Sequence, residues 1–393
     1  MIGLQTAARA EPAASYNGLA LTPPMGWNSW NKFRCDVNEE KVRGIADAIV
    51  ANGLDRRGYR TVTVDDCWMA STRDAGGKLM ADPVKFPSGM KALGDYLHAR
   101  GLKFGIYQSP TQGTCQKRPG SYGHEAQDAR QFAAWGVDYL KYDWCQTSPT
   151  ESPDMWADFP GYTQKQLAQV LFTRMSKELV ATGRPIVYSL SACCEKVDFP
   201  EWAGEVSNLW RTSTDISDSW ASMMFNFKQA AQYPDAAGPG AWNDPDMLEV
   251  GNGGMSDVEY RSHFSLWSVL AAPLIMGNDL RTMSPATKTI LSNKHLTRIN
   301  QDSFGKQARV VSSQGGRWVL AKQMRNGDRV VALFNESSSE KKISTTAQAA
   351  GLPPSSTYEV HDQWTGRKTT TSGALSAVVA PHATAVLRVA VAR

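Results

Sequence analysis

Short apolar segments alternate with longer segments of helical period between residues 21 and 304, and this alternation limits the possible folds more than any other feature. The stretch 38–58, for example, places Val42, Ile45 and Ile49 close to a 3.6-residue period, which predicts a helix. The eight apolar segments are PPMGWNSW, YRTVTVDDCW, LKFGIYQS, VDYLKYDWC, PIVYSLSAC, SNLWRTSTDI, GAWNDPDMLEV and APLIMGNDL. Eight strands that alternate with helices are typical of a closed parallel (β/α)8 TIM barrel. A doubly wound open sheet is the alternative, but none of the turns after the strands is a GxGxxG phosphate loop.

The sequence after residue 304 has a different pattern. RWVLAKQMRNGDRVVALFNESS indicates two strands on either side of Asn326 and Gly327, a residue pair that favours a tight hairpin turn. The later stretch TTTSGALSAVVAPHATAVLRVAV alternates without a helical period. We therefore predict a C-terminal antiparallel β-sandwich domain at residues 305–393, after the barrel. We expect it to support the barrel structurally, with carbohydrate binding as the alternative role.

The charge pattern excludes several classes of partner. The chain has 42 basic and 38 acidic residues, a net charge of +4, and no long block of like charge, so we expect no nucleic acid partner. No apolar run reaches the roughly 18 residues that a membrane helix needs, so we expect no membrane partner. The 6 histidines never fall in HExxH or another metal-ligand spacing. We predict neither a metal nor a cofactor.

The N-terminal residues and the cysteines favour export. Ala-Arg-Ala before Glu11 resembles the cleavage end of a secretory signal, although the apolar core of such a signal is absent. We expect residues 1–20 to form an N-terminal arm or a trimmed signal remnant. Four cysteines lie at or beside the ends of separate apolar runs, where an oxidising compartment would allow disulfides; they are Cys35, Cys67, Cys115 and Cys145. We predict a secreted or periplasmic protein.

The predicted strands end mostly in aspartates. In a parallel barrel the active site lies at the carboxyl ends of the strands. The polar residues there are Asp65, Asp66, Lys141, Asp143, Arg211, Asp215, Asp244, Asp246 and Asp279. Tryptophans accompany them at Trp27, Trp30, Trp68, Trp144, Trp210 and Trp242.

Carboxylates that converge with tryptophans suit sugar chemistry. Aromatic faces stack on the C–H faces of a pyranose, and two carboxyl groups can divide the duties of acid and nucleophile. A single aspartate at a strand end is often a helix cap, but five such ends are hard to explain as caps. A cation-binding cluster is the other interpretation, and the DxDxDG loop typical of one is absent.

Five motifs in this region resemble one known family. TPPMGWNSWNKF, VDDCWM, YLKYDWC, WRTSTDI and WNDPDML, in this order and at these spacings, closely resemble glycoside hydrolase family 27, the α-galactosidase and α-N-acetylgalactosaminidase family. The resemblance covers residues 21–302 and continues more loosely through the β domain. It implies a retaining exo-glycosidase that releases terminal α-D-galactosyl residues by double displacement through a covalent glycosyl-enzyme. The alternatives are α-N-acetylgalactosaminidase, β-L-arabinopyranosidase, and a non-catalytic sugar-binding protein.

The resemblance also implies roles for two carboxyl groups. Asp143 matches the nucleophile, and Asp215 matches the general acid/base; a retaining enzyme holds such groups roughly 5 to 6 Å apart. Lys141 points to the same face of the strand as Asp143, and we expect its ammonium to keep Asp143 ionised. Asp215 must be protonated at rest, which requires a drier or more negative setting.

Further positions match the sugar pocket of the family. Asp65 and Asp66 correspond to the residues that hold the axial 4-hydroxyl and the 6-hydroxyl of galactose. The rest of the predicted substrate-binding set is Trp30, Tyr107, Cys115, Lys141, Ser191, Arg211 and Asp246. Structural alternatives stay open, because Arg211 could pair with a structural aspartate and Tyr107 could pack in the barrel. The two disulfides common in the family correspond to Cys35–Cys67 and Cys115–Cys145.

The end of the predicted fifth strand departs from the family pattern. Family members commonly have Cys-Glu-Trp or Cys-Ser-Trp here, near the 2-position of the sugar, whereas this chain has Ser191, Ala192, Cys193 and Cys194. The smaller residues leave space of the kind that a 2-acetamido group would need. Two arrangements are open for the adjacent cysteines: a vicinal disulfide Cys193–Cys194, or two buried thiols.

The substrate class follows from the same resemblance. We expect galactose-containing oligosaccharides or glycoconjugates as partners, because an exo-acting enzyme of this family removes one terminal sugar. The intact pair Asp65 and Asp66 favours galactose over the other family specificities. We expect the protein to be a monomer or a homodimer.

Overall fold

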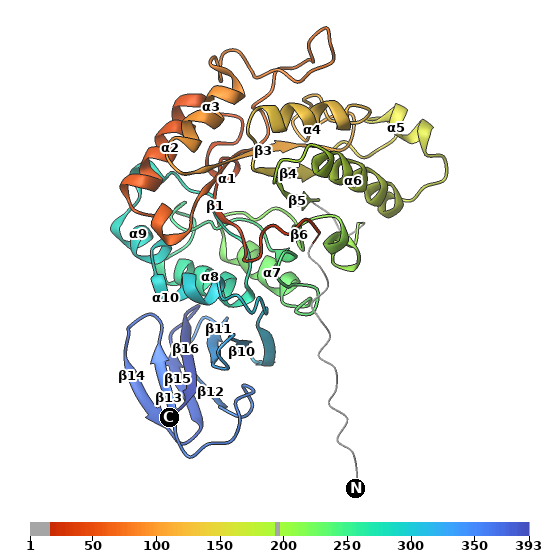
Figure 1. Cartoon of the computed structure of the whole chain (residues 1–393). Coiled ribbons are helices and arrows are strands. Elements are labelled where there is room, and N and C mark those ends of the chain that lie inside the picture. Colours follow the sequence, from red (N-terminus) through yellow and green to blue (C-terminus); the bar gives the residue numbers. More distant parts are fainter. Residues whose placement is uncertain (1–15, 193–196, 393) are drawn as a thin grey trace.

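The larger part of the protein is a barrel of eight parallel strands (Figure 1). The computed structural model describes residues 16–192 and 197–392. The barrel strands are β1 Met25–Asn28, β2 Thr61–Val64, β3 Lys103–Gln108, β4 Tyr139–Asp143, β5 Val187–Ser191, β6 Leu209–Arg211, β7 Trp242–Asp244 and β8 Leu274–Met276. They lie in chain order from β1 to β7, and β8 returns to pair with β1. Each strand coincides with one of the eight apolar segments, which confirms the predicted barrel.

The barrel closes between β7 and β8 through residues that follow β7. Leu248 forms an isolated parallel bridge with Met276. The backbone N of Leu248 donates to the Ile275 carbonyl at 2.7 Å, and the N of Gly277 donates to the Leu248 carbonyl at 2.9 Å. This closure holds the segment after β7, which carries Asp246, at the carboxyl rim.

Helices cover the outside of the barrel (Figure 1). They are α1 Trp30–Phe33, α2 Glu39–Ala51, α3 Gly89–His98, α4 Glu125–Ala134, α5 Pro153–Asp158, α6 Gln164–Ala181, α7 Trp220–Ala230, α8 Asp257–Leu270, α9 Pro285–Leu291 and α10 Lys294–Asn300. In α2 the predicted apolar face is buried, and the Asn38 side chain caps the helix by accepting from the N of Lys41 at 2.8 Å. Within residues 16–192 and 197–392, no helix is long and apolar enough to cross a membrane.

The connection between β5 and β6 differs from the other crossovers. Its described residues contain two short 3₁₀ helices, η2 Phe199–Glu201 and η3 Ala203–Glu205, and no α-helix. The sequence predicted helices after most strands, and this connection is an exception. Cys193 and Cys194 lie outside the described residues, so the choice between a vicinal disulfide and two thiols stays a prediction.

The C-terminal part is an antiparallel β domain. Its strands are β9 Arg309–Gln314, β10 Arg317–Gln323, β11 Arg329–Asn335, β12 Lys341–Thr346, β13 Tyr358–Asp362, β14 Lys368–Thr371, β15 Ala374–Val379 and β16 Thr384–Val391. Six of them form a sheet in the order β14-β13-β16-β11-β10-β9, and β12 pairs with β15. Asn326 and Gly327 lie in the turn between β10 and β11, where Gly327 has a φ of 91°, so the predicted hairpin is confirmed. The predicted β-sandwich is confirmed as well.

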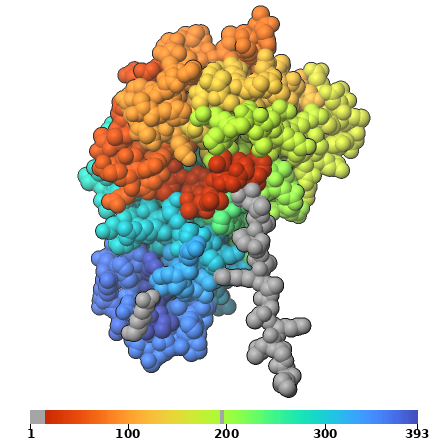
Figure 2. All heavy atoms as spheres, in the orientation of Figure 1, coloured from red at the N-terminus to blue at the C-terminus, as the bar shows by residue number. Residues whose placement is uncertain are grey.

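The β domain packs against the barrel along α8. The Trp364 Nε1 donates to the Ser265 Oγ at 2.9 Å, and the His382 ring lies 2.7 Å from a carboxylate oxygen of Glu259. Trp220 of α7 stacks on the His382 ring, with ring centres 4.2 Å apart. Figure 2 shows the β domain, in blue, directly against the cyan part of the barrel. These contacts support the structural role that we expected for the β domain.

The described end of the predicted N-terminal arm, residues 16–20, lies against the barrel. The Tyr16 hydroxyl donates to the Ser176 carbonyl at 3.0 Å, and the Trp242 Nε1 donates to the Ala20 carbonyl at 2.7 Å. The rest of the arm, residues 1–15, lies outside the described residues. These two bonds tie residues 16–20 to α6 and to β7.

Candidate active site

The carboxyl rim of the barrel collects most of the predicted site residues. Tyr107 lies in β3, Asp143 is the last residue of β4, and Arg211 is the last residue of β6. Asp65 directly follows β2, and Asp246 follows β7 by two positions. Because parallel strands end at the same rim, these side chains approach one another above the barrel core.

Lys141 bonds to Asp65 at this rim. The Lys141 Nζ donates to the Asp65 Oδ2 at 2.8 Å, and the Asn28 Nδ2 donates to the same oxygen at 2.7 Å. Both charged side chains are largely buried, with exposed fractions of 12% and 3%. A buried ion pair of this kind is geometrically specific, because losing one partner leaves an uncompensated charge in a dry site.

Asp143 is contacted from one side by a tyrosine and from another by a disulfide. The Tyr107 hydroxyl donates to the Asp143 Oδ2 at 3.0 Å, and the Cys115 Sγ lies 3.8 Å from the same oxygen. Burial raises the pKa of the Asp143 carboxyl; the Lys141 ammonium opposes this shift, and Asp215 adds to it. Lys141 therefore does not keep the pKa of Asp143 low, contrary to our expectation from the sequence, because burial outweighs its charge.

The sulfurs beside Asp143 do not form a metal site. Cys115, Cys145 and Asp143 place possible ligand atoms within 4.8 Å of one another. The two cysteines are joined in a disulfide, however, and the thiolate that binds metals is then absent. The structure also contains the disulfide Cys35–Cys67. Both disulfides that the family resemblance implied are thus present.

Asp66 sits in a set of hydrogen bonds from a neighbouring loop. Its Oδ1 accepts from the backbone N of Cys67 at 2.7 Å and from the Thr114 hydroxyl at 3.0 Å. Its Oδ2 accepts from the backbone N of Gln116 at 2.9 Å. Burial raises the pKa of Asp66 to about 6, although these bonds oppose the shift. The carboxylate is therefore held in one orientation, which suits recognition of a hydroxyl group.

Arg211 joins two aspartates and a serine. Its Nη2 donates to the Asp215 Oδ1 at 2.9 Å and lies 3.0 Å from the Asp246 Oδ2. Its Nη1 donates to the Ser191 Oγ at a longer 3.4 Å. Asp246 also accepts from the backbone N of Ile216 at 2.8 Å. Both aspartates that Arg211 contacts are predicted site residues, so its place in the sugar pocket stays a prediction.

The pKa of Asp215 is shifted in the opposite direction from that of Asp143. Burial acts to raise the pKa of Asp215, but the Arg211 guanidinium and the Lys141 ammonium outweigh it and hold the pKa below its ordinary value. We expected a drier or more negative setting that keeps Asp215 protonated. The setting in this structure is instead positive, so that expectation is wrong here, because Arg211 bonds directly to the carboxylate.

Trp30 lies at the edge of this group. Its side chain is half-buried, and its backbone N donates to the Asn28 Oδ1 at 2.8 Å. The Arg34 guanidinium lies 5.2 Å from the centre of its ring. Since Asn28 also bonds to Asp65, one side chain links the Trp30 backbone to the Asp65 carboxylate. A half-buried tryptophan at the rim is a residue type that stacks against sugars.

Two other strand-end aspartates have different surroundings. Asp279 bonds to Arg281 at 2.7 Å and caps the 3₁₀ helix η4 Leu280–Thr282, so the helix-cap interpretation applies to it. Asp244 lies close to the rim cluster, and its Oδ1 accepts from the N of Asp246 at 2.9 Å. Burial raises the pKa of Asp244 to about 6. Asp244 therefore supports the turn that presents Asp246.

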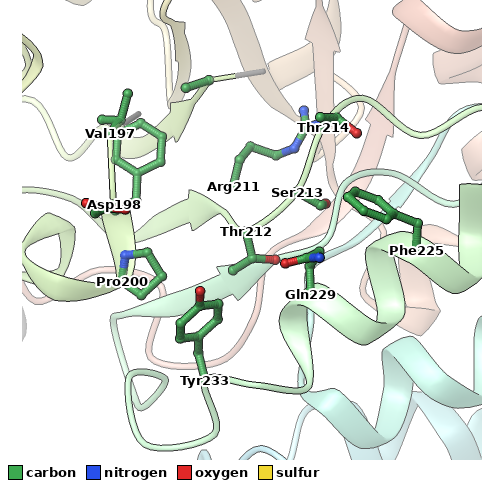
Figure 3. Close-up of a pocket in the computed structure, with 12 residues that line it drawn as sticks. Val197, Asp198, Pro200, Arg211, Thr212, Ser213, Thr214, Phe225, Gln229 and Tyr233 are labelled. Carbon is green, nitrogen blue, oxygen red and sulfur yellow. The ribbon is translucent and has the colours of Figure 1, made fainter. Parts of the chain in front are cut away.

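A cavity of about 130 Å³ lies beside Arg211, between the β5–β6 connection and α7 (Figure 3). Its lining residues are Ala192, Val197, Asp198, Phe199, Pro200, Arg211, Thr212, Ser213, Thr214, Phe225, Gln229 and Tyr233. Neither Asp143 nor Asp215 is among these described residues. Arg211 therefore lines this cavity and also bonds to Asp215.

Sequence reasoning missed residues that hold the predicted aspartates. Asn28, which binds Asp65, lies at the end of the first strand, so attention to polar residues other than aspartate would have found it. Thr114 and Gln116, which bind Asp66, lie in a loop without a periodic pattern. Gln116 uses its backbone, and the sequence carries no signal for such a contact.

Family models match both parts of the chain. The model described as alpha galactosidase A matches residues 22–302, and the model described as alpha galactosidase C-terminal beta sandwich domain matches residues 314–389. The first match alone spans more than half of the chain and includes the whole rim.

Individual relatives agree with these models. The chain is 45% identical over 377 residues to an alpha-galactosidase of Oryza sativa subsp. japonica, with 95% of this chain and 86% of the relative covered. It is 41% identical over 374 residues to an alpha-N-acetylgalactosaminidase of Gallus gallus, with 89% and 88% covered. The crystal structure of alpha-galactosidase I from Mortierella vinacea superposes with a TM-score of 0.89 at 35% identity, with 96% of this chain and 98% of that chain covered.

Proposed function

The chain belongs to glycoside hydrolase family 27, the α-galactosidase family, and from this membership we propose how its rim residues divide the reaction. The protein is a glycosidase. We propose that Asp143 is the nucleophile and Asp215 the general acid/base of a retaining double displacement. One observation carries this proposal: the positive charges of Lys141 and Arg211 lie close enough to both carboxyl groups to act on the pKa of each in the direction opposite to burial.

In the first step an oxygen of Asp143 attacks the anomeric carbon, and the bond from that carbon to the leaving oxygen breaks. Asp215 gives its proton to the leaving oxygen, so the aglycone departs as an alcohol. The Tyr107 hydroxyl, 3.0 Å from the Asp143 Oδ2, orients the attacking carboxylate. The product is a galactosyl ester of Asp143 with inverted configuration.

In the second step the ionised Asp215 takes a proton from water, and the water oxygen attacks the anomeric carbon. The bond from that carbon to Asp143 breaks, and galactose leaves with its original configuration. The Asp143 carboxylate and a protonated Asp215 are thereby restored. Two inversions at the same carbon account for retention.

The pKa directions require a change when the sugar binds. The reaction starts with Asp143 ionised and Asp215 protonated, whereas in this structure burial raises the pKa of Asp143 and the Arg211 guanidinium, against burial, lowers the pKa of Asp215. The resemblance assigns Arg211 and Asp246 to the sugar pocket. A sugar hydroxyl that accepts a hydrogen bond from Arg211 would weaken the bond between Arg211 and Asp215. The pKa of Asp215 would then rise. Substrate binding would thus prepare the acid.

The remaining predicted residues form the proposed galactose pocket. Asp65 and Asp66 would accept hydrogen bonds from the 4- and 6-hydroxyls, with Lys141 held by Asp65 and Trp30 stacked on the sugar. Terminal α-galactosides of oligosaccharides or glycoconjugates are the proposed substrates. Raffinose is the sugar seen with an alpha-galactosidase of Saccharomyces cerevisiae, which is 30% identical and superposes with a TM-score of 0.88.

Export, domain limits and assembly also remain proposals. The two disulfides support an oxidising compartment outside the cytosol. We propose that the barrel spans residues 21–304 and the β domain 305–393, because α10 ends at Asn300 and β9 begins at Arg309. A monomer or a homodimer stays a prediction.

A second substrate class deserves a direct comparison. Ser191 and Ala192 are small and buried, and Ala192 lines the 130 Å³ cavity together with Arg211. Space beside the 2-position would favour 2-acetamido galactosides. One preparation should therefore be assayed with aryl α-galactoside, aryl α-N-acetylgalactosaminide and aryl β-L-arabinopyranoside.

The result we expect is the highest kcat/KM on the α-galactoside. NMR of the first-formed sugar in the same reaction should show the α-anomer. A higher kcat/KM on the acetamido sugar would assign the second class. A first-formed β-anomer of galactose would exclude the double displacement.

A further inference from the structure

One buried asparagine of α7 ties together the two loops that carry Asp215 and Asp246. The Asn226 Nδ2 donates to the Thr214 carbonyl at 3.0 Å and to the Pro245 carbonyl at 2.9 Å. Thr214 directly precedes Asp215, and Pro245 directly precedes Asp246. Asn226 itself is fully buried, with an exposed fraction of 0%.

The orientation of this amide follows from its partners. Both neighbours are carbonyl oxygens, which only accept, and the NH₂ group offers one hydrogen to each of them. The reversed amide would point an oxygen at two oxygens. In Figure 3, two labelled residues of α7, Phe225 directly before Asn226 and Gln229 three positions after it, face the loop that contains Thr212 and Thr214. The helix thus supports this loop from below.

A second contact holds the same loop from the other side of Asp215. The backbone N of Ile216, the residue after Asp215, donates to the Asp246 Oδ2 at 2.8 Å. Asp246 has a φ of 77°, a left-handed backbone that is costly for a residue with a side chain, and its carbonyl accepts from the Trp267 Nε1 at 2.8 Å. The peptide groups on both sides of Asp215 are therefore fixed to the segment after β7.

We propose that Asn226 is a positioning residue for the proton transfer of Asp215, which it serves by holding the Thr214 and Pro245 carbonyls together. The inference rests on the proposed acid/base role of Asp215. Asn226 does not reach the sugar, because it is buried behind the loop. Proton transfer needs the donor within hydrogen-bond reach of the leaving oxygen, so a small loop shift would affect the acid more than the nucleophile.

The test uses the leaving group as a readout. A 2,4-dinitrophenyl aglycone leaves without a proton, whereas the methanol of methyl α-galactoside needs one. Asn226→Asp keeps the shape but replaces the two N–H donors by an oxygen that repels both carbonyls. We expect kcat/KM on methyl α-galactoside to fall on the order of 10²-fold, and kcat/KM on the dinitrophenyl substrate to fall less than about fivefold.

The ratio of the two kcat/KM values is independent of the folded fraction, so a loss of stability alone cannot produce this result. Asn335→Asp is the matched control, since the Asn335 amide is also fully buried and donates to the Val379 and Ala380 carbonyls in the β domain. It should leave the ratio unchanged. If Asn226→Asp does not fold, Asn226→Ala, which adds no charge, is measured in the same way.

An equal loss on both substrates would overturn the positioning role of Asn226. Asp215→Ala, measured in parallel, separates this failure from a failure of the proposed function. It should reduce kcat/KM on methyl α-galactoside far more than on the dinitrophenyl substrate. If Asp215→Ala lost the same kcat/KM on both substrates, the acid/base role of Asp215 would be overturned, and the inference on Asn226 with it.

Discussion

The rim holds its carboxylates by different means on its two sides. The β2–β4 side consists of Asp65, Asp66, Tyr107, Lys141 and Asp143, and the β6–β7 side consists of Arg211, Asp215 and Asp246. On the β2–β4 side Asp66 and Asp143 accept hydrogen bonds from hydroxyl or backbone groups, and the one cation bonds to Asp65. On the β6–β7 side one guanidinium pairs with both aspartates.

The difference sets the proton affinities of the two central carboxyl groups. Burial raises the pKa of Asp143, which bonds to no cation among the described residues; at Asp215 the bonded Arg211 outweighs burial and lowers the pKa. Because the two groups interact, the pH dependence of activity reports the pair and not each residue alone. Under the proposed acid role of Asp215, substrate binding therefore has to raise a pKa on the β6–β7 side.

The largest effect is expected from a substitution at the centre of the β2–β4 side. Asp143→Ala removes the attacking oxygen, so kcat should fall on the order of 10⁵-fold on every substrate. Asp138→Ala is the matched control, because Asp138 precedes the same strand at its opposite end and pairs there with Arg184 at 2.6 Å. It should lower the thermal midpoint while kcat stays near that of the parent. Full activity of Asp143→Ala would refute the nucleophile assignment.

A smaller loss is expected when the β2–β4 side keeps its nucleophile but loses a recognition group. Asp66→Ala should reduce kcat/KM by about 10²-fold on α-galactosides, because a buried, charge-assisted bond to a sugar hydroxyl is lost. Asp66→Asn preserves the shape without the charge, so its kcat/KM should lie between those of the parent enzyme and Asp66→Ala. Parent-like kcat/KM in Asp66→Ala would mean that Asp66 only holds the neighbouring loop.

The coupling between the two sides is tested by pH. Asp215 raises the pKa of Asp143, so Asp215→Asn should lower that pKa. Asp143 must be ionised to attack, and the acid limb of kcat/KM should therefore move to lower pH. The dinitrophenyl galactoside is the substrate, since it needs no proton. A limb that stays in place or moves to higher pH would show that the two carboxyl groups are not coupled as described.

The smallest effect should come from the contact between the β6–β7 side and the end of β5. The Ser191 Oγ accepts from the Arg211 Nη1 at only 3.4 Å, a weak hydrogen bond. Ser191→Ala should reduce kcat/KM by less than about fivefold, and equally for galactoside and acetamido galactoside. A loss confined to one of these sugars would place Ser191 in direct contact with the 2-position.

The barrel and the β domain could be predicted from the sequence because their signals are local. Apolar runs of strand length and the helical period of α2 coincide with buried faces in the structure. The hairpin turn at Asn326 and Gly327 is similarly encoded by two adjacent residues. The 3₁₀ helices between β5 and β6 were not predicted, since short turns of this kind lack a periodic pattern.

The site was predictable by residue type but not by electrostatics. Strand-end aspartates identified the rim. We expected Lys141 to act on Asp143, and the bond of its ammonium to Asp65 could not be foreseen because only the folded barrel brings the two together. The pairing of Arg211 with Asp215 likewise depends on the path of the loop after β6. Asn226 left no signal, since a buried asparagine in a helix resembles any other polar residue on the apolar face.

The most direct test of the two carboxyl roles is to trap the covalent intermediate. The enzyme is incubated with 2-deoxy-2-fluoro-α-galactosyl fluoride, digested, and sequenced by mass spectrometry. The fluorine at C2 slows both steps, and the fluoride leaves without a proton, so the galactosyl ester should accumulate. We predict one fluorogalactosyl group on Asp143, and the same label in Asn226→Asp. A label on Asp215, or an unlabelled enzyme that releases the β-anomer from α-galactosides, would contradict the assignment.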